Sequence, residues 1–252
     1  MPELHWEAVG RTDTGRVRKH NEDSILLRED GTLWCVADGM GGHGSGEVAS
    51  QLITSTLQRI KTPAHLADAI DSVDRALQSV HRALGEQGEK RGQIIGSTAL
   101  VAIPRAEYLA ILWAGDSRAY LQRGAQCHNL TTDHTQLQAM VDRGLVPPEE
   151  AEDHPAGRMV TRAVGAPGPI MVDVEVVRVE PGDRLLLASD GLGKHVADRE
   201  LAGLLRSTTD PRHVVDRIIA TVLERGAGDN VSVVVADFRG AAESPRGEQA
   251  PA

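Results

Sequence analysis

The sequence predicts an α+β fold in which mainly antiparallel β-sheets carry helices on their outer faces. Short runs rich in Val, Ile and Leu follow one another through tight turns, without the regular strand–helix alternation of a parallel sheet. A few other segments place apolar residues three and four positions apart, as amphipathic helices do. The chain has 252 residues, 40% of them hydrophobic, which is enough to bury a substantial core.

The predicted strands are filled with aliphatic residues, and Gly, Pro or Asp bounds most of them. In chain order they are residues 5–9, 24–27, 33–37, 97–103, 108–113, 119–122, 171–177, 184–188 and 231–237. The strands at 33–37 and 184–188 each lead into an Asp-Gly pair. Such a pair permits a sharp turn at the strand end and leaves a carboxylate there.

The main helices are predicted at residues 46–60, 63–84, 198–205 and 211–225. The last begins at Asp210-Pro211, a favourable N-cap and first-turn pair, and ends before Gly226. A short helix is expected at 135–143, and the proline-rich stretch that follows it to 168 is typical of a functional surface loop. Residues 240–252 lack periodicity and are expected to form a disordered tail.

Composition excludes several classes of function. The net charge is −9 and aromatic residues make up only 2%, so neither a basic surface nor base stacking favours nucleic-acid binding. No run of 18 apolar residues predicts a membrane span, and the N-terminus lacks a signal-peptide pattern. Cys35 and Cys127 show no metal spacing. We therefore expect a cytoplasmic protein that binds neither nucleic acid nor membrane.

The glycine-rich segment from Asp38 to Gly44 admits three interpretations. Its glycines match G-x-G-x-x-G after a strand and before a helix, as in dinucleotide-binding folds. However, Asp38 would repel a pyrophosphate, and the βαβ pattern of such folds is missing. A tight turn that needs glycine is the simplest alternative. In the third, the Asp38 carboxylate and the Gly39 carbonyl hold a divalent cation.

The third interpretation gains weight because the same pattern recurs. Asp116, Asp190 and Asp229 also lie at predicted strand ends beside glycine or in turns. A single Asp-Gly is usually a surface turn, but several carboxylates at one edge of a sheet would repel one another without cations. Oxygen ligands favour Mg²⁺ or Mn²⁺ over Zn²⁺. Two such ions could activate a water molecule and bind a phosphoryl oxygen.

Residues 12–23 form a second informative segment, in which basic residues precede Glu22 and Asp23. An arginine such as Arg18 suits a phosphate-binding site because its planar fork matches phosphate oxygens. A solvated charged loop would explain the same composition.

Together these segments resemble the ordered motifs of the PPM/PP2C family of metal-dependent protein Ser/Thr phosphatases, most closely its bacterial branch. The resemblance runs from about Glu7 to Asp237. It depends on residues 18–23, 38–42, 96–98, 115–118, 189–191 and 229–230, and residues 130–135 and 162–165 also resemble that branch. It implies an α-β-β-α sandwich with two central, mainly antiparallel sheets flanked by helix pairs. One phosphatase domain would span 1–239, with a flap at about 135–168.

The resemblance also implies the metal ligands. Asp38 would bridge two metal ions, the Gly39 carbonyl would bind one of them, and Asp190 and Asp229 would bind the other. Asp116 resembles the residue that holds a third, weaker metal ion in bacterial members.

Further roles follow from the same resemblance. Arg18 would bind the substrate phosphate and would share the catalytic role with Asp38. Glu22 and Asp23 would hold metal-bound water, and Asn230 would orient Asp229.

The sequence departs from the family pattern at two places. Met40 stands where some members have a histidine proposed as general acid, which leaves His43 or a metal-bound water as a candidate. Gly193-Lys194 stands where many relatives have Thr-Asp.

We therefore expect a phosphatase that hydrolyses phosphoserine and phosphothreonine by in-line attack of a water or hydroxide bridging two Mn²⁺ or Mg²⁺ ions. Its partners would be phosphoproteins and a bacterial Ser/Thr kinase that it opposes, and we expect a monomer. Two other functions remain open. They are a catalytically inactive phosphate-binding module on the same fold and a hydrolase of small phosphate esters.

Overall fold

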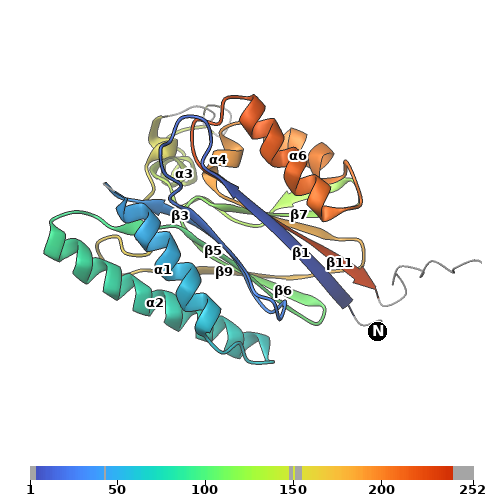
Figure 1. The fold of residues 1–252 in the computed structure, drawn as a ribbon, viewed down its shortest axis with the longest axis horizontal. Helices are drawn as coiled ribbons and strands as arrows, with labels where there is room; N and C mark the ends of the chain where they lie inside the picture. The colour runs from blue at the N-terminus through green and yellow to red at the C-terminus, as the bar shows by residue number, and fades with distance from the viewer. Residues whose placement is uncertain (1–3, 43, 148–149, 151–154, 241–252) are drawn as a thin grey trace, which may run out of the picture.

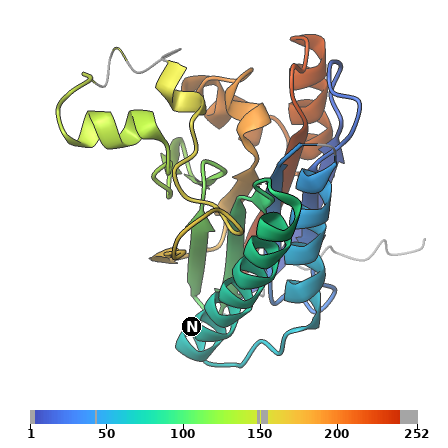
Figure 2. The ribbon, with the colours of Figure 1, turned by 90° about the vertical axis from the view of Figure 1, so that its left-hand side faces the viewer.

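Two β-sheets pack face to face, and a pair of helices covers the outer face of each sheet (Figures 1 and 2). The computed structural model describes residues 4–42, 44–147, 150 and 155–240. The predicted α+β sandwich with mainly antiparallel sheets is confirmed. None of the helices in the described residues is long and apolar enough to cross a membrane.

The five-stranded sheet has the order β1-β11-β10-β7-β8, and its neighbouring strands are antiparallel. Its strands are β1 (Leu4–Asp13), β11 (Val231–Gly240), β10 (Arg184–Ala188), β7 (Arg118–Arg123) and β8 (Gln126–Asn129). β1 and β11 pair along their whole length, from Leu4 opposite Gly240 to Asp13 opposite Val231. The first and last strands therefore lie side by side (Figure 1).

The six-stranded sheet has the order β2-β3-β5-β6-β9, with β4 paired to the end of β3. Its strands are β2 (Asp23–Leu27), β3 (Trp34–Met40), β4 (Gly96–Ser97), β5 (Ala99–Arg105), β6 (Tyr108–Ala114) and β9 (Asp173–Arg178). β3, β5 and β6 are buried along nearly their whole length. A helix layer covers one face of these strands and the second sheet covers the other, which explains their continuous apolar runs.

Helices α1 (Ser45–Arg59) and α2 (Leu66–Arg91) cover the six-stranded sheet, and α5 (Asp198–Leu205) and α6 (Pro211–Glu224) cover the five-stranded sheet (Figure 1). In α1 the apolar stripe of Ala49, Ile53 and Leu57 is fully buried. α6 begins as predicted, since the Asp210 carboxylate accepts a hydrogen bond from the Arg212 N–H at 2.8 Å.

The core between the sheets contains side chains of both. Trp34 of β3 and Phe238 of β11 meet edge to face with ring centroids 6.3 Å apart. Trp6 of β1 adds a tilted contact to Phe238 at 6.2 Å. This shared core fixes the position of one sheet on the other.

Several predicted boundaries are wrong. The helix expected at 63–84 begins at Leu66 and continues to Arg91, because Gly92, with φ at 64°, provides the left-handed C-cap. The strand expected at 97–103 is divided at Thr98 into β4 and β5. The tail was expected from 240, but Gly240 ends β11 and pairs with Leu4. The rest of the predicted tail lies outside the described residues.

Candidate active site

The predicted site residues come from both sheets and meet at one end of the sandwich. Asp38 lies near the end of β3, and Asp116 lies in the turn between β6 and β7. Asp190 begins the short helix α4 (Asp190–Gly193) after β10, and Asp229 precedes β11. Each of these residues thus lies at the end of a buried strand or next to one, which fixes its backbone in place.

Burial and neighbouring carboxylates dominate the electrostatics of Asp38 and Asp116. The pKa of Asp38 is raised well above its ordinary value, first by burial and then by repulsion from four other aspartates, Asp23, Asp190, Asp116 and Asp229. Burial, with repulsion from Asp190 and Asp133, raises the pKa of Asp116 to about 7. A divalent cation would relieve this repulsion.

The backbone around Asp38 is held by close contacts. The Asp38 N–H donates to Thr98 Oγ1 at 2.9 Å, and the Gly39 N–H donates to the Glu22 carbonyl at 3.0 Å. A Cβ at Gly39 would lie 2.1 Å from the Gly46 carbonyl oxygen and 2.5 Å from that of Glu22. Only glycine fits there, so the chain can turn past the start of α1.

Asp23 connects the two sheets inside the site. Its Oδ2 accepts hydrogen bonds from the hydroxyl of Ser189 at 2.8 Å and from that of Ser232 at 2.7 Å. Its Oδ1 is buried and has no hydrogen-bond partner. Burial raises its pKa to about 6, although the two serines oppose the shift. Asp23 therefore has a free acceptor available within the site.

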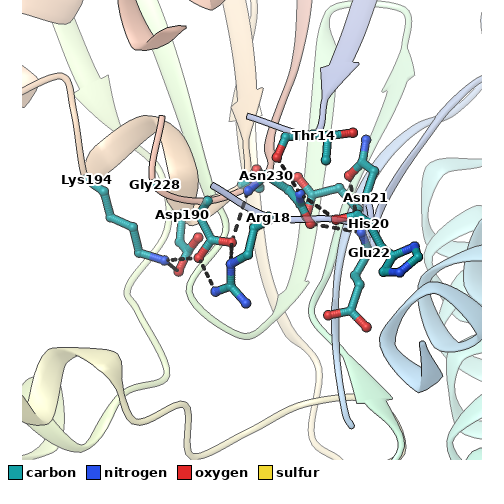
Figure 3. A network of polar contacts seen from close by, with 12 residues as sticks. Thr14, Arg18, His20, Asn21, Glu22, Asp190, Lys194, Gly228 and Asn230 are labelled. Carbon is teal, nitrogen blue, oxygen red and sulfur yellow. Dashed lines mark hydrogen bonds and ion pairs between the residues drawn. The ribbon is translucent and has the colours of Figure 1, made fainter. Parts of the chain in front are cut away.

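Arg18 and Lys194, both labelled in Figure 3, each contact the Asp229 carboxylate. Arg18 makes a two-point contact, with Nε 2.8 Å from Oδ1 and Nη2 2.9 Å from Oδ2. Lys194 Nζ lies 2.9 Å from Asp229 Oδ2 and 2.5 Å from Asp190 Oδ2. Burial favours the neutral form of Asp229, but the two cations outweigh it and lower the pKa.

Asn230 fastens the loop that carries Arg18. Its Nδ2 donates to the carbonyls of Thr14 at 2.9 Å and His20 at 3.0 Å, and its Oδ1 accepts the Glu22 N–H at 2.8 Å (Figure 3). The side chain thus contacts residues 14–22, whereas Asp229 is contacted by the Asn230 backbone N–H at 3.0 Å. In this structure Asn230 fixes the Arg18 loop directly.

The turn that carries Asp116 has supports that the sequence did not reveal. His134 accepts the Gly115 N–H on Nδ1 at 3.1 Å, and its Nε2 lies 3.2 Å from Asp173 Oδ2. The imidazole stacks on Trp113 with centroids 6.0 Å apart. Asp133 makes a two-point ion pair with Arg118. The only sequence signal for these contacts was that residues 130–135 resemble the family pattern.

The donor set suits a hard divalent cation, because it consists of carboxylate and carbonyl oxygens. The buried, unpartnered Oδ1 of Asp23 is the observation that fits such an ion. Burial and neighbouring carboxylates raise the pKa of Asp38, and a cation would oppose that shift. As the side chains stand, no three His, Cys, Asp or Glu residues within the described ranges are gathered closely enough to hold a metal ion. Arg18 and Lys194 instead neutralise part of the cluster.

The other expected or conspicuous features are four histidines and a cavity. His43, the candidate general acid, and His154 lie outside the described residues. His195 accepts the Gly228 N–H at 3.0 Å and so has a structural contact, and His213 is exposed. A cavity of about 560 Å³ is lined by Arg184 and Asp237 among others. It lies at the start of β10, whereas Asp190 follows the end of that strand.

The two-sheet sandwich and its carboxylate-rich end match those of a known family. The family model described as Protein phosphatase 2C matches residues 14–237. Serine/threonine phosphatase stp of Listeria monocytogenes is 32% identical over 236 residues, which cover 90% of this chain and 94% of that protein. The chain therefore belongs to the protein phosphatase 2C family, in its bacterial branch.

Other relatives and solved structures are similar to this chain over more than nine tenths of its length. Serine/threonine protein phosphatase PstP of Mycobacterium tuberculosis is 37% identical over 91% of this chain, which spans only 44% of PstP. The solved structure of PppA, a key regulatory component of T6SS in Pseudomonas aeruginosa, has a TM-score of 0.86 at 36% identity and covers 93% of this chain and 98% of PppA. The structure of the PstP catalytic domain in complex with 2 manganese ions has a TM-score of 0.82 at 33% identity. The match covers 94% of this chain and 99% of the chain in that structure.

Proposed function

We propose that this protein hydrolyses phosphoserine and phosphothreonine in phosphoproteins and that it needs Mn²⁺ or Mg²⁺. The observation that carries the proposal is the cluster of aspartates from both sheets beside Arg18, in a chain that the Protein phosphatase 2C model matches over 14–237. The relative PstP has a structure with manganese, which supports Mn²⁺ as the first ion to test. The physiological role would be to oppose a Ser/Thr kinase.

Asp38, Asp190, Asp229 and the Gly39 carbonyl would hold two divalent cations, and Asp116 would hold a third, weaker one. When bound, such ions lower the pKa of a water nucleophile and stabilise charge on phosphoryl oxygens. Arg18 binds the phosphate with its planar guanidinium. Attack is in line with the leaving oxygen of the serine or threonine.

Glu22 and Asp23 would position water at the edge of the site. The free Oδ1 of Asp23 is available as an acceptor, and the Glu22 backbone is fixed at both its N–H and its carbonyl. Asn230 maintains the position of the Arg18 loop through its contacts with Thr14 and His20. These residues hold water or backbone in place and do not react with the phosphate.

The test is phosphate release from a phosphothreonine peptide, measured with Mn²⁺, with Mg²⁺ and with excess EDTA. We expect release with the metal ions and none with EDTA. Asp38→Ala should abolish release, while Asp71→Ala, an exposed site on α2, should not change it.

Three outcomes would contradict the proposal. Near wild-type turnover in Asp38→Ala would show that the site is misassigned. Metal binding and phosphate binding without hydrolysis would favour the phosphate-binding module. Faster turnover of p-nitrophenyl phosphate than of any phosphopeptide tested would favour a small-ester hydrolase.

A further inference from the structure

Lys194 is positioned by its own helix to reach the proposed metal ligands. α4 begins at Asp190, and Lys194 follows one turn later at the i+4 position. Residues at this spacing share one face of a helix, so the lysine side chain extends beside the Asp190 carboxylate. Its side chain is 39% exposed, so it has a path into solvent.

Two neighbouring residues bind the turn before β11 together. The Lys194 ammonium contacts the Asp229 carboxylate at 2.9 Å, and the His195 ring accepts the Gly228 N–H at 3.0 Å. Arg225 in turn donates to the His195 carbonyl at 2.6 Å. The backbone at 194–195 is therefore fixed against the 228–229 turn, and the ammonium contacts both Asp190 and Asp229. Figure 3 shows the Lys194 side chain reaching Asp190.

The carboxylate oxygens that would receive a metal ion are already engaged. Asp229 Oδ1 contacts Arg18 Nε and the Asn230 N–H, and its Oδ2 contacts Arg18 Nη2 and Lys194 Nζ. Asp190 Oδ2 contacts Lys194 Nζ. The lysine is the one cation bound to both members of the Asp190–Asp229 pair among the described residues.

We propose that the Lys194 ammonium is a tethered competitor of the divalent cation at the Asp190–Asp229 pair. The inference rests on the proposed function, because the pair is the metal site proposed above. The ammonium joins the two carboxylates while no divalent ion is bound, and a metal ion binds there only as the lysine swings away. Metal affinity is thus set by this chain's own side chain as well as by the ligands.

The chemistry of lysine suits this role. An ammonium is a compact single charge on a flexible four-carbon stem, so it can be displaced without moving the backbone. Its tether keeps it at high effective concentration beside the pair. A divalent ion carries twice the charge and prevails only when its concentration is sufficient. The expected consequence is a Mn²⁺ affinity at least tenfold weaker than that of the same site without the ammonium.

The experiment is a calorimetric titration of Mn²⁺ into the EDTA-stripped, desalted 252-residue protein. We compare the wild type with Lys194→Met, which keeps the stem and removes the charge, and with Lys194→Arg, which keeps a charge. Lys61→Met is the matched control, because Lys61 is exposed and lies beyond the far end of α1, about 20 Å along the helix from Ser45. We expect tighter Mn²⁺ binding, by at least tenfold, in Lys194→Met only.

A second readout is the Tm, which we measure first without metal ions and then with Mn²⁺. Without metal, Lys194→Met leaves Asp190 and Asp229 facing each other without the ammonium, so its Tm in EDTA should fall below those of the wild type and Lys61→Met. The rise in Tm on adding Mn²⁺ should then be larger than in the wild type. The affinity gain should also persist at high salt, since a contact pair is screened far less than a distant charge.

The outcomes separate this inference from the proposed function. Unchanged or weaker Mn²⁺ binding in Lys194→Met, with the wild type binding normally, overturns the competitor role and leaves the phosphatase proposal intact. A wild type that binds no Mn²⁺ overturns the metal site and this inference together. If Lys194→Met does not fold, Lys194→Gln provides the same comparison with a neutral polar side chain.

Discussion

At the scale of the single residue, Arg18 binds Asp229 in this structure and is proposed to bind the substrate phosphate. In this structure its guanidinium binds Asp229 with both Nε and Nη2, yet half of its side chain is exposed to solvent. A bidentate contact fixes the plane of the guanidinium, so the pair with Asp229 would keep the fork oriented for the proposed phosphate. Attraction to Asp229 and the hydrogen bonds between them raise the Arg18 pKa.

Arg18→Ala should raise KM for a phosphothreonine peptide by about tenfold or more while kcat changes less. A hydrogen bond to a charged group contributes about 1.5–3 kcal/mol, and about 1.4 kcal/mol is a tenfold change in binding. Steady-state kinetics with saturating Mn²⁺ measure both constants. Arg16→Ala is the control, because Arg16 is an exposed arginine in the same loop. An unchanged KM in Arg18→Ala would contradict a phosphate-binding role.

Asp116 should make the stability of the metal-free protein depend on pH. Its pKa is raised, mainly by burial, to about 7, so the folded state favours the protonated carboxyl. The stabilisation from that proton is complete below about pH 4 and is lost as pH rises to about 7. In EDTA, the Tm of Asp116→Asn should therefore fall less than the Tm of the wild type as the pH rises from about 4 to about 7.

Thermal melting across a pH series checks this expectation. Asp71→Asn, at an exposed site on α2, should follow the wild type. Parallel curves for the wild type and Asp116→Asn would contradict a protonated Asp116 in the folded protein. Added Mn²⁺ should reduce the pH effect, because the ion favours the ionised carboxylates.

The sequence predicted which aspartates lie at the strand ends, but it did not predict which cations contact their carboxylates. Asp38, Asp116, Asp190 and Asp229 were recognisable because each lies in a short Gly-containing or turn segment next to an apolar strand. The contacts of Lys194 and His134 depend on neighbours 35 and 39 residues away in the chain. No local pattern encodes such distances, so these roles required the structure.

At the scale of the element, the strand β10 ends beside the proposed site and begins at a separate buried ion pair. Arg184 at its start is buried and makes a two-point ion pair with Asp237 of β11. The same guanidinium donates to the carbonyls of Leu205, Thr208 at 2.8 Å and Thr209 at 3.1 Å. It thus ties the end of α5 and the loop before α6 to the sheet.

Arg184→Met should destabilise the fold by about 3–5 kcal/mol, because it leaves the buried Asp237 with only the half-exposed Arg239, 3.6 Å away, as a counter-charge. Urea unfolding measures the change. Arg199→Met, on the exposed side of α5, should change stability little. The double variant Arg184→Met with Asp237→Asn should recover part of the loss, and no recovery would mean that the lost carbonyl contacts dominate.

Short elements were the hardest to predict from the sequence. β8, with four residues, and α4, with four, are too short to show a period. α4 depends on a close approach instead, since a Cβ at Gly191 would lie 1.9 Å from the Asn230 carbonyl oxygen. The long strands β3, β5, β6 and β11 were predicted within a few residues, because burial on both faces makes them continuously apolar.

At the scale of the whole molecule, the site depends on the packing of one sheet against the other. Asp38 comes from the six-stranded sheet, whereas Asp190 and Asp229 adjoin strands of the five-stranded sheet. The core between the sheets, with Trp34 and Phe238 in contact, therefore sets the separation of the proposed ligands. The two-sheet architecture was predictable, but the family resemblance, and not periodicity, gave the order of its layers.

Phe238→Ala should lower the free energy of unfolding by about 3–5 kcal/mol, because it leaves a cavity between the sheets. The side chain is 1% exposed and contacts both Trp6 and Trp34. Tyr108→Ala removes an aromatic ring that is 45% exposed and should cost much less. Urea unfolding compares the two variants, and equal losses would show that Phe238 does not support the contact between the sheets.

The pairing of the first strand with the last also has a mechanical consequence. Leu4 and Gly240 face each other at one end of the β1–β11 ladder, and Asp13 and Val231 face each other at its other end. A force that pulls residues 4 and 240 apart would load the hydrogen bonds one pair at a time, as in a zipper. Rupture would start at the end remote from Asp229 and reach the carboxylates last. Single-molecule stretching should therefore meet low resistance at first and then a late step that Mn²⁺ strengthens.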